Sequence, residues 1–221
     1  MFQLYLITDR KLAARHGGLR AIVEAALRAA STIASPGAVA VQLREKDLDA
    51  HELYELARAL RELCSRYGAP LLVNDRLDVV MAAEADGVHL PANSFAVADA
   101  RRLLGPSRLI GVSTHHAGEV VAAAHAGADF TVFGPVYSPL SKPAAGAGRG
   151  VAALFAAAHA GAPMPVYALG GITTERIDRW AGVAAPGSDR PRGAAVIGAV
   201  FGAEDPATAT IALLRALSAA H

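Results

Sequence analysis

Short apolar stretches alternate along the chain with longer segments in which apolar residues recur every three or four positions. Such short stretches are typical of strands buried on both faces of a parallel sheet, and the longer segments are typical of amphipathic helices. The predicted strands are Leu4 to Thr8, Val39 to Leu43, Leu71 to Val73, Gly87 to Leu90, Leu109 to Ser113, Phe130 to Gly134, Val166 to Leu169 and Ala195 to Gly198. The predicted helices are approximately Leu19 to Ser31, Ala50 to Tyr67, Leu77 to Ala83, Val97 to Leu104, Gly118 to Ala126, Val151 to His159, Thr174 to Ala181 and Pro206 to Ala219.

This alternation amounts to eight strand–helix units in 221 residues. An open doubly wound sheet would also combine parallel strands with covering helices, but eight regular units in this length close more naturally into a barrel. We therefore expect an α/β protein with a single (β/α)₈ TIM barrel domain over residues 1–221. In such a barrel the polar residues that follow each strand converge on one mouth.

Two segments interrupt the rhythm. Residues Tyr137 to Gly150 are rich in proline and glycine and follow the sixth strand, so we expect a mobile flap over the catalytic end. Residues Ala184 to Gly193 precede the eighth strand, so we expect an exposed insertion at the opposite end.

Charge and cysteine content narrow the functional classes. The 21 basic and 20 acidic residues are interspersed, so a nucleic-acid partner is not expected. No apolar run reaches the roughly 18 residues that a membrane span requires, so no membrane association is expected. A single cysteine, Cys64, excludes an internal disulfide, and the chain opens with a strand pattern. These features favour a cytoplasmic protein in which Cys64 belongs to the core.

Two successive strands end in glycine. Gly170 and Gly171 follow the seventh strand and lead into a helix with Thr173 as its N-cap, and the eighth strand ends in Ile197 and Gly198. Paired glycines let backbone N–H groups approach an anion, and the positive end of a helix favours the same ligand. The last two loops of a barrel commonly hold one phosphate. For the glycine pair alone, a tight turn without a ligand is the alternative interpretation.

The second strand ends in the run Gln42-Leu43-Arg44-Glu45-Lys46. Alternation directs Gln42, Arg44 and Lys46 to one side, and Leu43 and Glu45 to the other. Two cations and an amide on one side suit a polyphosphate.

Other strand ends carry further candidates. Asn74 and Asp75 form an oxygen pair suited to Mg²⁺ after the third strand. His89 at the end of the fourth strand is expected to support the site from the core. The remaining candidates are Ser113 and His115 after the fifth strand, and Ser141 and Lys142 in the segment after the sixth. Each could instead be a helix cap or a solvated charge, but their shared position favours a site for small phosphorylated substrates.

These motifs together resemble the thiamin phosphate synthase and TenI family over essentially the whole chain. The resemblance lies in Tyr5-Leu6-Ile7-Thr8-Asp9, Gln42-Leu43-Arg44-Glu45-Lys46, Asn74-Asp75-Arg76, Asp86-Gly87-Val88-His89-Leu90, Gly111-Val112-Ser113-Thr114-His115, Gly134-Pro135-Val136-Tyr137 and Gly170-Gly171-Ile172. It implies a barrel that acts late in thiamin biosynthesis. Synthases of this family join hydroxymethylpyrimidine pyrophosphate to thiazole phosphate with Mg²⁺ and release pyrophosphate. TenI relatives isomerise carboxythiazole phosphate with a histidine.

The resemblance also implies roles for single residues. Gln42, Arg44 and Lys46 match the family's contacts to pyrophosphate and pyrimidine, and Ser113 and Lys142 match further contacts to pyrophosphate. Asn74 matches an amide contact, and Asp75 matches the first Mg²⁺ ligand. The thiazole-phosphate cup is matched by Gly171, Ile197 and Gly198. In a tautomerase, His115 would move the proton.

The chain departs from the synthase pattern at two places. After Leu90 the synthases have Gly-Gln-x-Asp, whose Asp is the second metal ligand, but this chain has Pro91-Ala92-Asn93-Ser94, which is closer to TenI. The synthase pattern Thr-x-Thr-Lys is here Pro139-Leu140-Ser141-Lys142. A tautomerase has no use for all the pyrophosphate contacts, so synthase chemistry is favoured. A TenI-type tautomerase and a non-catalytic regulatory relative that binds thiazole phosphate remain alternatives. Whether Ser94 or Asn93 completes a metal site, and whether the barrel forms a homodimer, stays open.

Overall fold

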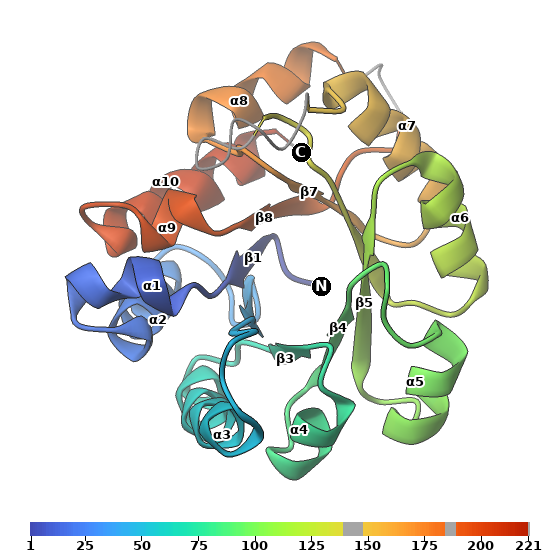
Figure 1. Ribbon diagram of the computed structural model, residues 1–221. Helices are drawn as coiled ribbons and strands as arrows, with labels where there is room; N and C mark the ends of the chain where they lie inside the picture. The colour runs from blue at the N-terminus through green and yellow to red at the C-terminus, as the bar shows by residue number, and fades with distance from the viewer. Residues whose placement is uncertain (139–147, 184–188, 221) are drawn as a thin grey trace.

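The computed structural model describes residues 1–138, 148–183 and 189–220 (Figure 1). In it eight parallel strands follow chain order around a closed barrel, and the eighth pairs with the first. The strands are β1 Leu4–Ile7, β2 Val39–Leu43, β3 Leu71–Asn74, β4 Gly87–Leu90, β5 Leu109–Thr114, β6 Phe130–Phe133, β7 Val166–Leu169 and β8 Gly193–Val196. The predicted TIM barrel is confirmed.

Helices form a ring around the strands (Figure 1). The α-helices are α1 Arg10–Ala13, α2 Leu19–Ala30, α3 Ala50–Arg66, α4 Leu77–Ala82, α5 Val97–Leu104, α6 Ala117–His125, α7 Val151–Gly161, α8 Thr174–Asp178, α9 Gly198–Phe201 and α10 Pro206–Ala219, and 3₁₀ turns span Ala14–His16 and Arg179–Gly182. The predicted helices are all present within a few residues, except that the last turn of the seventh is 3₁₀. The short helices α1 and α9 were not predicted, because four residues are too few to show a helical period.

The predicted eighth strand is displaced by two residues from the observed one. Ile197 leaves the strand at φ −119° and ψ −83°, and Gly198 begins α9. The strand instead starts at Gly193, where a Cβ would lie 1.9 Å from the carbonyl oxygen of Gln3. Glycine in a strand often marks such a close backbone approach. In the sequence, Gly193 looks like the end of a loop.

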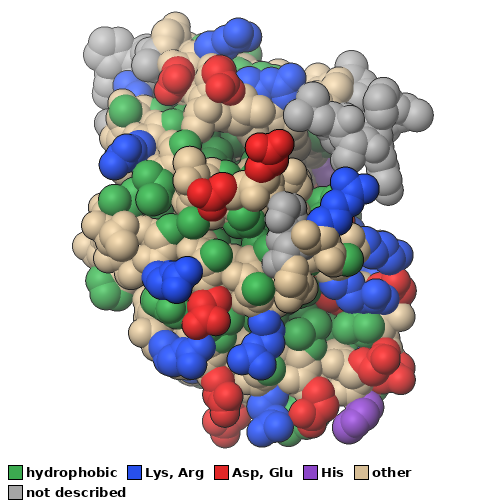
Figure 2. Space-filling model, turned by 90° about the vertical axis from the view of Figure 1, so that its left-hand side faces the viewer, with side chains coloured by type: hydrophobic (Ala, Val, Ile, Leu, Met, Phe, Trp, Pro, Cys, Tyr) green, Lys and Arg blue, Asp and Glu red, His purple; other side chains and the backbone are tan. Residues whose placement is uncertain are grey.

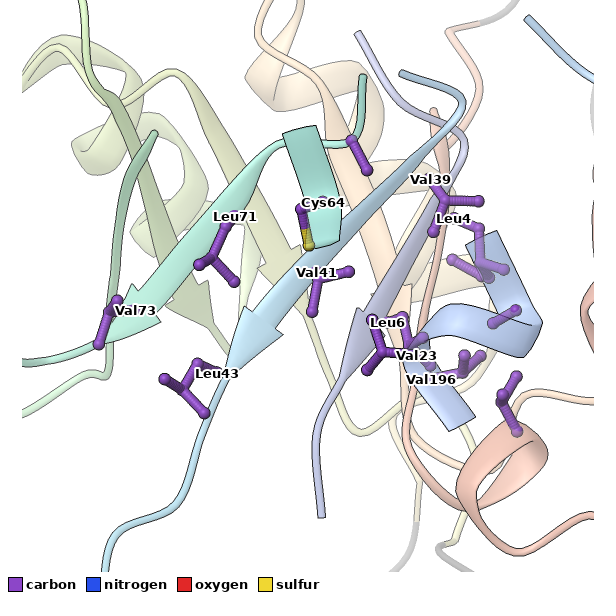
Figure 3. Packing of buried hydrophobic residues seen from close by; sticks show 14 of the residues in the cluster. Leu4, Leu6, Val23, Val39, Val41, Leu43, Cys64, Leu71, Val73 and Val196 are labelled. Atoms are coloured by element: carbon purple, nitrogen blue, oxygen red, sulfur yellow. The ribbon is translucent and has the colours of Figure 1, made fainter. Parts of the chain in front are cut away.

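The main core lies between the barrel and its helices (Figure 3). Outward-facing aliphatic residues of β1 and β2, such as Leu6 and Val41, pack there with Val23 of α2 and Cys64 of α3. Burial raises the pKa of the Cys64 thiol to about 12, so the thiol stays protonated. Its place in the core is as expected, and thiolate chemistry is disfavoured.

Aromatic rings fill the lower barrel interior. The rings of Phe2 and Tyr167 stack with centroids 4.5 Å apart, and the Phe130 ring meets both edge-on at 5.2 and 5.5 Å. The Tyr167 hydroxyl donates to the Phe2 carbonyl oxygen at 2.8 Å. This layer of packed rings fills the barrel interior on the side away from the site, which is built from residues at the carboxyl ends of the strands.

The surface carries charges of both signs. On the face shown in Figure 2, acidic and basic side chains are interspersed with apolar ones. None of the helices in the described part of the chain combines the length and the apolar composition that crossing a lipid bilayer requires.

Gly111 allows a test of the interior packing. A Cβ on Gly111 would lie 2.3 Å from Cζ of Phe130, so Gly111→Ala should displace the ring and lower the free energy of unfolding by about 1–3 kcal/mol. Gly118 in α6 is the control, because the nearest atom to an added Cβ there is 3.4 Å away. Gly118→Ala should be neutral or stabilise by up to about 1 kcal/mol. Urea unfolding measures both, and a Gly111→Ala transition equal to the parent's would contradict this packing.

Candidate active site

The β2 end brings a buried amide and two cations to the mouth. Gln42 is buried, and its Nε2 donates to the Tyr5 hydroxyl at 3.1 Å. Arg44 is half-buried, and among the described residues its guanidinium makes no hydrogen bond or ion pair. Lys46 is exposed and lines a cavity of about 230 Å³ together with Asn74 and Asp75. Both cations are therefore available to an anion.

His89 lies just beneath this mouth. It is buried, and its Nε2 is 2.9 Å from Ser113 Oγ, while Nδ1 has no partner among the described residues. Burial, helped by the charge of Arg44, lowers the pKa of His89 to about 3, so the ring is neutral. We assign the proton of the neutral ring to Nε2. Nδ1 then carries only a lone pair, and a buried lone pair without a partner costs less than a buried N–H without one. Ser113 then accepts from His89 and keeps its own proton for an anion.

Asp75 is held in an unusual backbone conformation. Its φ is 67°, in the left-handed region that few residues other than glycine adopt. Its N–H donates to the His89 carbonyl oxygen at 2.9 Å, and the Ser94 hydroxyl donates to its Oδ1. The contact to Asp75 thus comes from Ser94 and not from Asn93. Strain of this kind persists where surrounding structure enforces it, often at functional sites.

The donor set around Asp75 is modest. Within residues 1–138, 148–183 and 189–220, no group of three or more His, Cys, Asp or Glu side chains is placed to share a metal ion. Mg²⁺ commonly needs only one or two carboxylates and keeps several waters. The half-buried Asp75 carboxylate at the edge of a cavity therefore fits Mg²⁺ but not a metal that demands a full protein cage.

His115 after β5 has a defined tautomer when neutral. Its Nδ1 lies 2.6 Å from the Gly134 carbonyl oxygen, which can only accept, so Nδ1 carries the proton. Nε2 is left as a proton acceptor. The next residue, His116, is the N-cap of α6.

The two glycine-ended loops form one cavity. We call it the phosphate cup: about 260 Å³, lined by residues that include 170–173 and 197–199. Gly170 and Gly171 have φ values of 102° and 59°, which favour glycine. The structure therefore brings together all four predicted cup residues, Gly170, Gly171, Ile197 and Gly198.

Neighbouring side chains support the cup. Arg176 of α8 donates to the Gly171 carbonyl oxygen, and its guanidinium carbon lies 4.6 Å from the centroid of the Tyr137 ring. A Cβ on Gly171 would lie 2.5 Å from Arg176 Nη1 and 2.9 Å from the Ser138 carbonyl oxygen. A bulky residue at Gly171 would thus disturb the support as well as the cup.

Comparison with known proteins identifies the family. A model described as thiamine monophosphate synthase matches residues 4–200. The chain belongs to the thiamine monophosphate synthase family. A Geobacter sulfurreducens relative is 48% identical over 98% of this chain and 94% of its own length. Thiamine-phosphate synthase of Moorella thermoacetica is 40% identical over 100% of this chain and 98% of its own. The solved thiamine phosphate pyrophosphorylase from Pyrococcus furiosus is 32% identical, with a TM-score of 0.82, over 99% of this chain and 96% of that one.

Membership confirms the resemblance seen in the sequence and makes the chain one of a family of thiamin-biosynthetic transferases. Two predicted site residues, Ser141 and Lys142, lie outside the described residues, as do residues 139–147 of the predicted flap and 184–188 of the predicted insertion. The described end of this segment returns to the residues that follow β6, where the Arg149 N–H donates to the Pro135 carbonyl oxygen at 2.8 Å.

Sequence reasoning missed three contacts of this family member's site. These are the Ser94 hydroxyl on Asp75, the support of the cup by Arg176, and the buried hydrogen bonds of Glu45. Glu45 was expected only to point away from the mouth. The Arg-Glu-Lys order was the available signal, since an acid between two cations at a strand end needs a hydrogen-bonding partner of its own when it is buried.

Gly198 offers a clean test of the cup. It lines the cavity, and a Cβ there would meet no atom within 4 Å, so Gly198→Val should fill space without a clash. The dissociation constant for thiazole phosphate, the expected ligand, should rise by about tenfold or more, or about 1.4 kcal/mol. Gly182→Val is the control, because an added Cβ at Gly182 also meets nothing within 4 Å and Gly182 does not line the cup. Calorimetry showing equal affinity for both variants and the parent would remove the cup from the site.

Proposed function

We propose that this chain joins hydroxymethylpyrimidine pyrophosphate to thiazole phosphate, forming thiamin phosphate and releasing pyrophosphate. One observation carries the proposal: the carboxyl ends of the strands hold two separate groups of residues suited to anions. One is the phosphate cup after β7 and β8. The other follows β2, where Arg44 makes no ion pair among the described residues and Lys46 lines a cavity with Asp75. A substrate with a single phosphate would need only the cup. The names of the relatives support the same reaction.

The chain's own residues would act mainly by position and charge. As the C–O bond to pyrophosphate breaks, pyrophosphate takes the electron pair, and Arg44 and Lys46 stabilise the growing negative charge. The Ser113 hydroxyl donates to a phosphate oxygen, with His89 holding its orientation. The electron-rich pyrimidine supports the cation left on its methylene, and the thiazole nitrogen attacks that carbon. The cup holds the thiazole by its phosphate, so no protein nucleophile is required.

We propose Mg²⁺ as the cofactor, with Asp75 as its protein carboxylate ligand. When bound, Mg²⁺ would offset charge on the pyrophosphate oxygens. Asp75 offers one oxygen that Ser94 does not occupy. Ser94 itself would orient the carboxylate in place of a second acidic ligand.

His115 supports a second candidate function, the tautomerase. Its Nδ1 is tied to Gly134 and its Nε2 is left as an acceptor, which suits a proton shuttle on the thiazole ring. A non-catalytic relative would bind thiazole phosphate in the cup and do neither reaction.

We also propose a cytoplasmic location and small phosphorylated substrates as the natural ligands. The buried free thiol of Cys64 and the cavities at the mouth support both ideas. A homodimer remains a prediction, to be checked by light scattering.

Substitutions at Arg44 and His115 separate the two enzymatic functions. Removing charge from the leaving-group region in Arg44→Gln should cost about 2–4 kcal/mol in the barrier to coupling, whereas His115→Ala should cost little. The assay follows pyrophosphate release and thiamin phosphate with both substrates and Mg²⁺. Arg58→Gln is the matched control, since Arg58 is an exposed arginine of α3. No coupling by the parent, together with isomerisation that is lost in His115→Ala, would replace the synthase by the tautomerase.

Ser94→Asp tests the metal site without relying on activity. Two carboxylates in contact should repel each other, so the variant should unfold at lower temperature without Mg²⁺ and recover when Mg²⁺ is added. Calorimetry should show Mg²⁺ binding, with pyrophosphate present, about tenfold tighter than in the parent, or about 1.4 kcal/mol. Ser94→Ala, which adds no charge, should show no such recovery. A Ser94→Asp variant indifferent to Mg²⁺ would exclude Asp75 as a ligand.

A further inference from the structure

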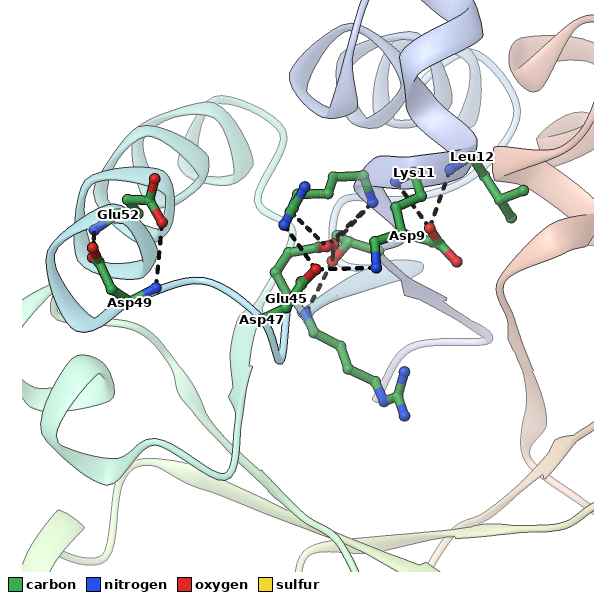
Figure 4. A network of polar contacts seen from close by, with 10 residues as sticks. Asp9, Lys11, Leu12, Glu45, Asp47, Asp49 and Glu52 are labelled. Atoms are coloured by element: carbon green, nitrogen blue, oxygen red, sulfur yellow. Dashed lines mark hydrogen bonds and ion pairs between the residues drawn. The ribbon is translucent and has the colours of Figure 1, made fainter.

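Glu45 lies between Arg44 and Lys46 in sequence and lines the same cavity as Lys46, but its carboxylate turns toward the segment that follows β1. Its side chain is only 5% exposed. The Thr8 hydroxyl donates to Oε1 at 2.7 Å, and the Arg10 N–H lies 3.2 and 3.3 Å from the two carboxylate oxygens (Figure 4). The carboxylate therefore joins the end of β2 to the segment that follows β1.

Thr8 carries this connection to the backbone of Arg44. Its hydroxyl has one proton, which goes to Glu45, so a lone pair is left to accept the Arg44 N–H at 2.9 Å. The Thr8 N–H in turn donates to the Gln42 carbonyl oxygen at 2.9 Å. The strand register ends at the pair Ile7 and Gln42, so these bonds extend the order of the sheet to the residue that carries the guanidinium.

Other charges enclose this cluster from the outside. Asp9 Oδ1 accepts the N–H groups of Lys11 and Leu12, which leaves the first N–H of α1, that of Arg10, to Glu45. Asp47, two residues beyond Glu45, pairs with Arg10 at 2.9 Å and with Lys11 at 3.0 Å. Those outer pairs are largely exposed and contribute little, so the buried carboxylate is the main connection.

We propose that Glu45 is a positioning residue for anion binding, whose buried carboxylate, through Thr8, fixes the backbone of Arg44 at the end of β2. The inference rests on the proposed function. A carboxylate only accepts, so it can serve the Thr8 O–H and the Arg10 N–H together. A glutamine at this position would have an NH₂ group in place of one carboxylate oxygen, so two hydrogen-bond donors would face each other.

The charge of Glu45 should give this role a recognisable pH dependence. Burial is the main cause that raises the pKa of Glu45. The hydrogen bonds from the Thr8 hydroxyl and the Arg10 N–H act against it, the charge of Asp9 adds to it, and the guanidinium of Arg10, whose Nε lies 3.7 Å from Oε2, also lowers it. Acidification through that pKa protonates the carboxyl and weakens the connection, so anion affinity should fall. Stability should move the opposite way. The folded chain holds this proton more tightly than the unfolded chain, so the contribution of Glu45 to stability is full at low pH and is lost as pH rises through the folded pKa.

The test compares Glu45→Gln with the parent and with Glu55→Gln, an equal charge change on exposed α3. Calorimetry with inorganic pyrophosphate and Mg²⁺, from pH 5 to 8, should show about tenfold or greater loss of affinity in Glu45→Gln at pH 8 and a smaller loss at pH 5. The free energy of unfolding of the parent minus that of Glu45→Gln should decrease as the pH rises from 5 to 8. Glu55→Gln should follow the parent. Equal pyrophosphate affinity of Glu45→Gln and the parent at every pH would overturn the inference.

Variants at Thr8 keep the test decisive if Glu45→Gln does not fold. Thr8→Val keeps the volume but removes the hydroxyl between Glu45 and Arg44, so its affinity for pyrophosphate should fall. Thr8→Ser keeps the hydroxyl, so its affinity for pyrophosphate should equal the parent's. Parental affinity in Thr8→Val would overturn the inference. The thiamin phosphate assay separates this outcome from failure of the proposed function: a parent that makes no thiamin phosphate but shows the Glu45 contrast would refute the reaction and leave the positioning role intact.

Discussion

Closure of the barrel between β8 and β1 is the constraint on which the site depends. The Ala194 N–H donates to the Gln3 carbonyl oxygen at 3.0 Å, and the absence of a side chain on Gly193 permits that approach. Closure leaves the ladder without an edge and directs every strand's carboxyl end to one mouth. The phosphate cup after β7 and β8 and the cations after β2 thereby lie at the same end of the barrel although more than 120 residues separate them in sequence.

The fold could be predicted because the hydrophobic pattern and the barrel support each other. Apolar runs of the right length mark the strands, and all eight strand–helix units were found. The start of β8 could not be predicted, because Gly193 takes part in the sheet through a close contact with a residue 190 positions earlier. Local propensity cannot register such a contact.

The site was predictable in its residue types but not in its connections. Alternation placed Arg44 and Glu45 on opposite sides, which agrees with the effect of the Arg44 charge on the buried His89 and the contact of Glu45 with Thr8. It also placed Lys46 opposite Glu45, but these two residues line the same cavity. The partner of Glu45, Thr8, is 37 residues away and follows another strand, β1. Likewise the contact of Ser94 with Asp75 depends on a backbone φ of 67°, which no pattern of polar and apolar residues encodes.

The two regions proposed to bind anions differ in how they are built. The cup uses glycine backbone, kept in shape by Arg176 and Tyr137, and it is preorganised at little electrostatic cost. Among the described residues, the region around β2 to β4 concentrates unfavourable features: a guanidinium without an ion pair, a buried carboxylate and a histidine nitrogen without a hydrogen-bond partner. Such costs survive selection where a function needs them. A polyphosphate would relieve the first of them, which is why the synthase reaction explains this half of the mouth better than a reaction on one phosphate.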